Sequence, residues 1–199
     1  MKKKKKHPTP ILGTVLQKIA PRIGAVVTME PVWQIVGQIA FKNGRKSYFK
    51  YSSLDLNPMG ASAIARDKDF ASFFIHKEGY PVPLGEAFYS DIWCQTIGSK
   101  RNIKMAYGYA QKLGWPVIVK PDNWSQGVGV TLVYNQKEFL QALKKIFTYD
   151  RVALVQKYLI GRDYRVVVLD DEIISAYERI PLNVTGDGRT TIMGLLRKK

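Results

Sequence analysis

The sequence predicts an α+β fold in which helices pack on an antiparallel sheet. Apolar residues recur at helical spacing over residues 103–113, and Gly114 follows as a stop signal. An apolar strand at 117–119, an alternating strand at 130–134 and a helix at 135–147 come next, followed by three further strands. Helices and short strands in this order are typical of helices layered on one sheet.

Two strands are predicted within residues 34–51, joined at Asn43-Gly44, a dipeptide that favours a type I′ turn because both positions accept positive φ. Residues 54–66 lack a clear period and are predicted to be an irregular connection. A helix is then expected to begin at Asp67. Its expected buried residues are Phe70, Phe73 and Phe74.

The helix at 135–147 begins with Asn135 and Glu138, which resemble a capping box. Residues 152–158, 164–169 and 172–178 are predicted strands, the last two joined at a turn. The residues at this turn are acidic and clustered, as metal ligands often are. A tight hairpin turn, in which aspartates are common, explains the cluster better than a metal site does. The expected buried residues of the helix are Phe139, Leu140, Leu143, Ile146 and Phe147, and the acidic residues are Asp170, Asp171 and Glu172.

The composition is that of a globular protein with a full core, because 46% of the 199 residues are hydrophobic and 24% are charged. The formal net charge of +15 favours anionic partners, such as nucleotide phosphates or acidic substrates. The lysine run at 2–6 carries five of these charges, which leaves +10 on the rest. It is expected to belong to a disordered tail at 1–10, since no aromatic residues interleave with it as strand stacking on nucleic acid requires.

The only cysteine, Cys94, excludes an internal disulfide and favours the cytoplasm. Residues 11–20 contain Gln17 and Lys18 and stop at Pro21, so they make a poor signal-peptide core. No stretch approaches the roughly eighteen uninterrupted apolar residues of a membrane span. The sequence therefore argues against export and against a membrane partner.

The most informative segment is the loop that follows the strand at 117–119. Lys120 emerges at the end of this strand, Gly127 and Gly129 leave backbone N–H groups accessible, and Ser125 adds a hydroxyl donor. This pattern predicts a phosphate cradle at a hairpin tip. It lacks the spacing of a P-loop or a dinucleotide fingerprint, and an ordinary glycine-containing hairpin is the alternative on the loop alone.

The chain also resembles the ATP-grasp superfamily, and within it the group of cyanophycin synthetase and the ribosomal-protein glutamate ligases. The resemblance runs from about Asn57 to the C-terminus, with blocks in the same order and spacing. The blocks are Ala-Arg-Asp-Lys at 65–68 with Gly-Tyr-Pro-Val-Pro at 79–83, Lys-Pro at 120–121, Val-Gln-Lys-Tyr-Leu-Ile-Gly-Arg-Asp-Tyr-Arg-Val at 155–166, Arg-Ile-Pro at 179–181, and Val-Thr-Gly-Asp-Gly-Arg-Thr-Thr-Ile at 184–192.

The resemblance implies that two lysines contact the phosphates of ATP, and their positions here are Lys68 and Lys120. For Lys68, a solvated residue in the first turn of a helix is the alternative. The segment from Gln156 to Ile160, which includes Lys157, Tyr158 and Leu159, matches the hinge between subdomains, whose backbone meets the adenine edge. Many members have glutamate at the position of Gln156, but the glutamine amide can also accept from the adenine amino group.

The resemblance further implies that Asp163 accepts hydrogen bonds from the ribose, and a turn aspartate is the alternative. It places Arg165 near the transferred phosphate or the acyl phosphate, where a guanidinium can hold oxyanions. Arg179 could act on an acidic substrate, although a surface arginine is the stronger interpretation.

The expected organisation is a tail at 1–10, an N-terminal region with the start of the ATP-grasp fold at 11–115, and a nucleotide-binding subdomain at 116–199. Family members continue beyond this point with residues that hold Mg²⁺. The notable expectation is therefore a partial ATP-grasp fold whose magnesium ligands lie in a further C-terminal part, in cis or on a partner chain.

The expected function is the ATP-binding part of an ATP-dependent carboxylate–amine ligase that works through an acyl phosphate. Its expected partners are ATP, an amino-acid or peptide carboxylate, and an amine acceptor. A non-catalytic nucleotide-binding module or half of a split ligase is the main alternative. A weaker alternative is a binder of polyanions or nucleic acid, based on the basic tail.

Overall fold

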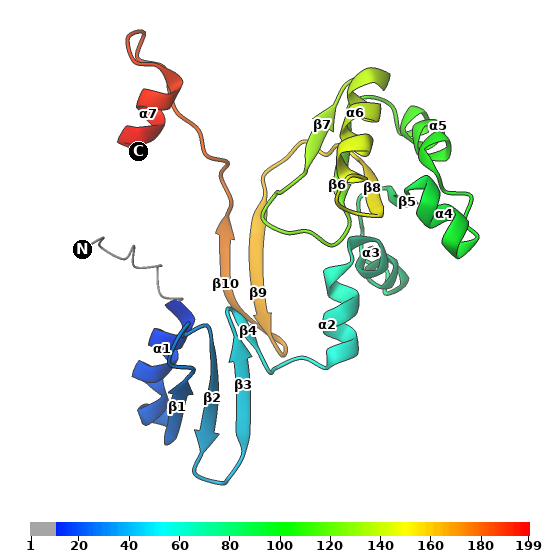
Figure 1. Cartoon of the computed structure of the whole chain (residues 1–199). Helices are drawn as coiled ribbons and strands as arrows, with labels where there is room; N and C mark the ends of the chain where they lie inside the picture. Colours follow the sequence, from blue (N-terminus) through cyan, green and yellow to red (C-terminus); the bar gives the residue numbers. More distant parts are fainter. Residues whose placement is uncertain (1–10) are drawn as a thin grey trace. The chain divides into compact units, whose positions relative to one another are not determined.

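The computed structural model describes residues 11–199 and divides into two compact units (Figure 1). The first unit holds the described residues up to Val82 together with residues 122–125, and the second holds residues 83–121 and 126–199. The predicted lysine tail lies outside the described residues. Helices and antiparallel strands occur in both units, so the predicted α+β class is confirmed.

The first unit begins with α1 and a short 3₁₀ helix, followed by a four-stranded antiparallel sheet in the order β1-β2-β3-β4. Its small core forms where α1 packs on the sheet. The elements are α1 (Ile11–Ile19), η1 (Ala20–Ile23), β1 (Ala25–Met29), β2 (Val36–Phe41), β3 (Lys46–Lys50) and β4 (Ser53–Leu54). The core residues are Ala20, Ala25, Ile39 and Phe49, with Leu12 and Leu16 packed against them.

The hairpin between β2 and β3 is present as predicted, but the prediction of its turn type is wrong. Gly44 has a φ of +82°, whereas Asn43 does not have a positive φ. Instead, the Oδ1 atom of Asn43 accepts a hydrogen bond from the Arg45 N–H at 3.0 Å. The loop is longer than a two-residue turn. The Asn43 side chain stabilises it by accepting a hydrogen bond from the backbone two residues further along.

Two predictions for the following segment are also wrong. Residues 59–66 form a helix, α2 (Met59–Arg66), and not an irregular connection. In the next helix, α3 (Lys68–Lys77), the three phenylalanines expected in the core are 44–62% exposed. Neither helix contains a buried residue. The three phenylalanines are Phe70, Phe73 and Phe74.

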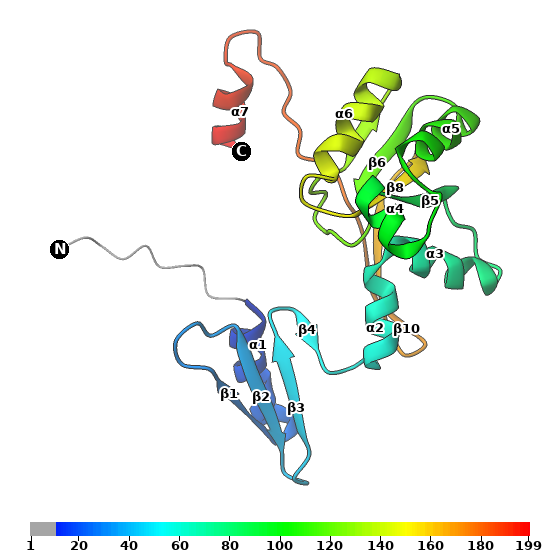
Figure 2. The same ribbon diagram turned by 45° about the vertical axis from the view of Figure 1, so that its right-hand side comes forward.

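The second unit contains a four-stranded antiparallel sheet in the order β5-β8-β6-β7. Helices α5 and α6 pack on one face of this sheet (Figure 2). The elements are β5 (Gly85–Tyr89), α4 (Asp91–Ile97), α5 (Ile103–Leu113), β6 (Val117–Pro121), β7 (Thr131–Val133), α6 (Gln136–Ile146) and β8 (Val152–Lys157). Fully buried core residues include Ala106, Ala110, Val117, Val119, Val133, Phe139, Leu143 and Val155.

Helix α6 shows how local signals fix these elements. The Asn135 side chain accepts from the Glu138 N–H at 3.0 Å, and the Glu138 carboxylate accepts in return from the Tyr134 N–H at 2.9 Å. This reciprocal arrangement satisfies N–H groups at the helix start. Phe139, Leu143 and Ile146 are buried, as the period of the sequence predicts. The predicted helix at 103–113 is confirmed as α5.

The chain continues in the second unit with a two-stranded antiparallel sheet, β9 (Tyr164–Leu169) and β10 (Glu172–Glu178), and with helix α7 (Ile192–Lys198). Asp170 has a φ of 51° at the turn between β9 and β10, as expected for a hairpin. Residues 11–199 contain no group of three His, Cys, Asp or Glu side chains able to hold a metal ion.

Within the same range, no helix has both the length and the apolar character needed to cross a lipid bilayer.

Candidate nucleotide-binding site

The second unit places Lys120 on the sheet face opposite α5 and α6. In β6 the buried residues Val117 and Val119 pack in the helix-covered core, so Ile118 and Lys120 point to the other face. The pairing of β6 with β8 aligns Ile118 with Gln156 and Lys120 with Leu154. We call the sheet face formed by these four residues the Lys120 face.

The ammonium group of Lys120 is fixed by Gln156. Its Nζ donates a hydrogen bond to the Gln156 Oε1 at 2.7 Å, diagonally across the two strands. Gly85, on the neighbouring strand β5, makes room for the glutamine, because a Cβ atom there would lie 3.2 Å from the Cβ and Cγ atoms of Gln156. The sheet thus positions a partly buried cation at the start of the glycine-containing loop.

The loop between β6 and β7 is a hairpin connection, as predicted, because Val119 pairs with Thr131. Its glycines have left-handed backbone conformations, with φ of +74° at Gly127 and +73° at Gly129. A Cβ atom on Gly127 would meet nothing within 4 Å. On Gly129 it would lie 2.8 Å from both the Pro121 Cγ and the Tyr149 Oη. Of the two glycines, Gly129 is therefore the one that lies close to the end of β6.

This difference predicts that Gly129→Ala lowers the free energy of unfolding more than Gly127→Ala does. Both substitutions place a Cβ in the left-handed region, which costs about 1–2 kcal/mol. Only Gly129→Ala adds a clash with the proline ring, and overpacking of this kind costs about 1–3 kcal/mol more. Urea unfolding of the two variants measures the difference. Equal loss of unfolding free energy in both would contradict the close approach at Gly129.

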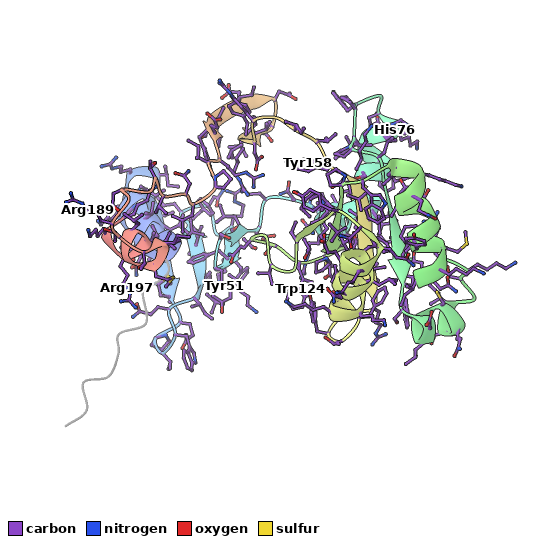
Figure 3. The ribbon with its side chains drawn as sticks, turned by 90° about the horizontal axis from the view of Figure 1, so that it is seen from above. Tyr51, His76, Trp124, Tyr158, Arg189 and Arg197 are labelled. Carbon is purple, nitrogen blue, oxygen red and sulfur yellow. The ribbon has the colours of Figure 1, made fainter. Side chains whose placement is uncertain are left out.

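The first unit contains the other predicted lysine and the loop residues 122–125 (Figure 3 labels Trp124). Lys68 is the first residue of α3. Its Nζ donates hydrogen bonds to the carbonyl oxygens of Asp122 and Trp124, both at 2.6 Å. Lys68 is therefore half-buried and bonded to the loop, and not a solvated side chain. Ser125 is exposed in the same segment.

Asp122 is the only buried charged residue in the described chain, with 6% of its surface exposed. Its Oδ1 accepts from the Asp69 N–H at 3.0 Å, at the N-terminal end of α3. Burial raises the pKa of the Asp122 carboxyl, and the hydrogen bond from the Asp69 N–H opposes this rise. The nearby Asp67 and Asp69 carboxylates raise the pKa further, and Lys68 lowers it.

The raised pKa predicts a pH dependence of stability. The folded state holds the Asp122 proton more tightly than the unfolded chain, so this stabilisation is present below the ordinary pKa of 3.8 and is lost as pH rises through the raised value. Asp122→Asn keeps an acceptor oxygen without the charge. It should lose less unfolding free energy than the wild type between pH 4 and pH 7, and Asp171→Asn in the β9–β10 turn should behave as the wild type. Identical slopes for Asp122→Asn and wild type would contradict this account.

The remaining predicted site residues lie at or after the end of β8 in the second unit. Gln156 and Lys157 end the strand, and the Lys157 N–H donates to the Leu84 carbonyl at 2.8 Å. Tyr158 and Leu159 follow outside regular structure and are 37% and 59% exposed (Figure 3 labels Tyr158). These are accessible positions for contacts with a ligand, and their role at adenine stays a prediction.

Asp163 and Arg179 form an ion pair, with the Arg179 guanidinium 2.7 Å from the Asp163 Oδ1. The side chains are 57% and 50% exposed, so solvent screens the pair. If Asp163 binds the ribose as predicted, its carboxylate oxygens must accept hydrogen bonds from both the ribose hydroxyls and the Arg179 guanidinium. Arg165 lies on β9 opposite Tyr177 and is exposed.

Sequence reasoning missed Asp122 as a functional candidate. The only local signal is that a carboxylate directly follows Lys120-Pro121. Its partner Asp69 is 53 residues away in the chain. No short motif could have connected the two.

A family model described as "D-ala D-ala ligase C-terminus" matches residues 86–187. Cyanophycin synthetase of Trichormus variabilis is 29% identical over 136 residues, which cover 68% of this chain and 14% of that protein. The glutathione biosynthesis bifunctional protein GshAB of Enterococcus faecalis is 32% identical over 139 residues, covering 68% and 17%. This chain thus spans a small part of the length of these relatives.

Among solved structures, the D-alanine–D-alanine ligase of Helicobacter pylori is similar with a TM-score of 0.44 and 22% identity, over 53% of this chain and 29% of that one. The ligase of Bacillus anthracis in complex with ATP gives a TM-score of 0.42 at 24% identity, over 53% and 31%. The family model spans more than half of the chain and includes β6, the loop and β8. The chain therefore belongs to the D-Ala–D-Ala ligase C-terminal family of the ATP-grasp superfamily.

Proposed function

We propose that this chain binds ATP and forms the nucleotide-binding part of an ATP-dependent carboxylate–amine ligase. The observation that carries the proposal is the geometry of Lys120. A lysine leaves a buried strand, is held at 2.7 Å by Gln156, and begins a loop with two left-handed glycines. A point charge beside accessible N–H groups suits the phosphates of a nucleotide.

The proposed roles follow the Lys120 face and the loop. Lys120 contacts phosphate oxygens, and the N–H groups near Gly127 and Gly129 bind the same phosphates. Gln156, Lys157, Tyr158 and Leu159 receive the adenine edge. Lys68 and Ser125 contribute further donors, Asp163 meets the ribose, and Arg165 approaches the acyl phosphate.

In such a reaction ATP phosphorylates a carboxylate, and an amine displaces phosphate from the acyl phosphate to form an amide. The contribution of the protein is positioning and electrostatic stabilisation of the charged groups. An amino acid or peptide is the proposed carboxylate substrate, in keeping with the similarity to cyanophycin synthetase and to a glutathione biosynthesis protein and with the basic charge of the chain. We place the reaction in the cytoplasm, where ATP is available.

Magnesium does not fit the described residues alone, because residues 11–199 hold no group of three side chains able to bind a metal. No step of the proposal therefore runs through a metal bound by this chain. We propose that ligands for Mg²⁺ come from a further C-terminal part or a partner chain, as members of the family use Mg²⁺ with ATP.

The test is calorimetric titration of the chain with ATP, followed by an assay for ADP release with pooled amino acids and short peptides. The proposal expects ATP binding that a polyanion such as heparin does not abolish at physiological salt. Amine-dependent ADP release would identify a ligase, and ATP binding without release would favour a nucleotide-binding module. No binding of ATP would overturn the proposal.

A further inference from the structure

The N-terminal end of α3 is capped by a distant residue. Asp67 occupies the N-cap position of this helix, but its side chain makes no capping hydrogen bond. The carboxylate of Asp122 takes this role, because its Oδ1 accepts from the Asp69 N–H at 3.0 Å. An anionic acceptor is favourable at this position because the first N–H groups of a helix lack partners within the helix.

The same helix end also binds the backbone of the loop. The Lys68 N–H and the Lys68 Nζ both donate to the Asp122 carbonyl oxygen, at 3.4 Å and 2.6 Å. The Nζ also donates to the Trp124 carbonyl oxygen at 2.6 Å. In all of these bonds the start of α3 supplies the donors, and the side chain and carbonyl oxygens of the loop are the acceptors.

We propose that Asp122 and Lys68 form a clasp that shapes the first residues of the loop, 122–125, for nucleotide binding. Here the clasp means the contacts among Lys68, Asp69, Asp122 and Trp124. Asp122 is a positioning residue, which acts on the nucleotide through the loop. Lys68 has a second role besides contacting phosphate, since it anchors the loop before a nucleotide arrives. This inference rests on the proposed function.

The burial of Asp122 explains why this one side chain can order residues 122–125. Asp122 is 6% exposed, so a lost partner cannot be replaced fully by water. The segment that follows, from Asn123 to Val128, is exposed to solvent. Without the clasp, residues 122–125 would have to be ordered by the nucleotide, and that ordering would lower the affinity.

The test uses the full chain and four variants: Asp122→Ala, Asp122→Asn, Lys68→Ala and Asp67→Ala. Hydrogen exchange without nucleotide reports the Asp69 amide and the amides of residues 122–125. We expect exchange to become about tenfold faster in Asp122→Ala and Lys68→Ala. Asp122→Asn keeps an acceptor oxygen and should restore slow exchange. Asp67→Ala is the matched control, an aspartate at the same helix end without a capping bond, and should exchange as the wild type.

A second readout compares the ligands ATP and adenosine by calorimetry. Asp122→Ala should weaken ATP binding at least about fivefold and leave adenosine binding unchanged, because the clasp shapes only the phosphate loop. Equal losses for both ligands would overturn the proposal, as would wild-type exchange in Asp122→Ala. If Asp122→Ala does not fold, Lys68→Ala decides the exchange experiment.

The proposed function and the clasp can fail separately. If the wild type binds no ATP, the proposed function is wrong, but the exchange rates without nucleotide still decide whether the clasp orders the loop. If the wild type binds ATP and Lys68→Ala exchanges as the wild type, Lys68 is only a phosphate contact and the clasp is wrong.

Discussion

Lys120→Ala should weaken the binding of ATP to this chain by at least about tenfold. The substitution removes a charge-assisted bond to phosphate worth about 1.5–3 kcal/mol, and each 1.4 kcal/mol corresponds to a factor of ten in affinity. The fold should survive, because the Lys120 side chain lies outside the core cluster of the second unit and the buried residues of β6 are unchanged.

The matched control is Lys144→Ala, which removes the same charge from an exposed position on α6 in the same unit. It should bind ATP as the wild type does at physiological salt, because dissolved ions screen the interaction between exposed charges more than about 8 Å apart. Calorimetric titration measures both affinities. Equal affinities of wild type and Lys120→Ala for ATP would show that the loop does not bind phosphate.

Phe139→Ala should have the largest effect on stability. Phe139 on α6 is 0% exposed, and its ring centroid lies 6.1 Å from that of Tyr107 and 5.8 Å from that of Trp115. Truncating a fully buried phenylalanine costs about 3–5 kcal/mol, from lost burial and from the cavity that remains. The residue joins α5 and α6 to the sheet that carries Lys120.

The control for this prediction is Phe73→Ala, on α3, whose side chain is 62% exposed. It should cost far less, because water already contacts most of the ring. Chemical unfolding compares the two variants. A loss below about 1 kcal/mol in Phe139→Ala would contradict the packing of the second unit.

The sequence predicts the second unit well because the signals for its elements are local. The period of α5, the reciprocal capping of α6 by Asn135 and Glu138, and the apolar run of β6 each lie within one short segment. The loop and its glycines are also local features, so the hairpin tip was predicted together with Lys120.

The errors lie in the first unit, where the signals are weak or misleading. Helix α2 consists largely of small residues, and Met59 and Ile64 are its only large apolar residues, so few side chains carry a detectable helical spacing. The aromatic residues of α3 have helical spacing, but the ones expected in the core are exposed in this unit. Periodicity indicates which residues share a face of a helix and does not show what covers that face.

The contacts of the site residues could not be predicted, because they depend on strand register and distant pairing. The bond between Lys120 and Gln156 joins residues 36 positions apart and requires β6 and β8 to be neighbours. The clasp joins residues more than 50 positions apart. A single sequence shows the residue types at these positions but not their partners.

The most direct test of the central claim is an NMR titration of the uniformly ¹⁵N-labelled full chain with ATP. Binding through the Lys120 face and its loop predicts shifts of the amide signals from residues 120–130 and 156–159. A depression of about 820 Å³ in the first unit, lined by residues such as Tyr48 and Lys50, provides an alternative location. Shifts confined to residues 28–55, or no shifts at saturating ATP, would contradict the account.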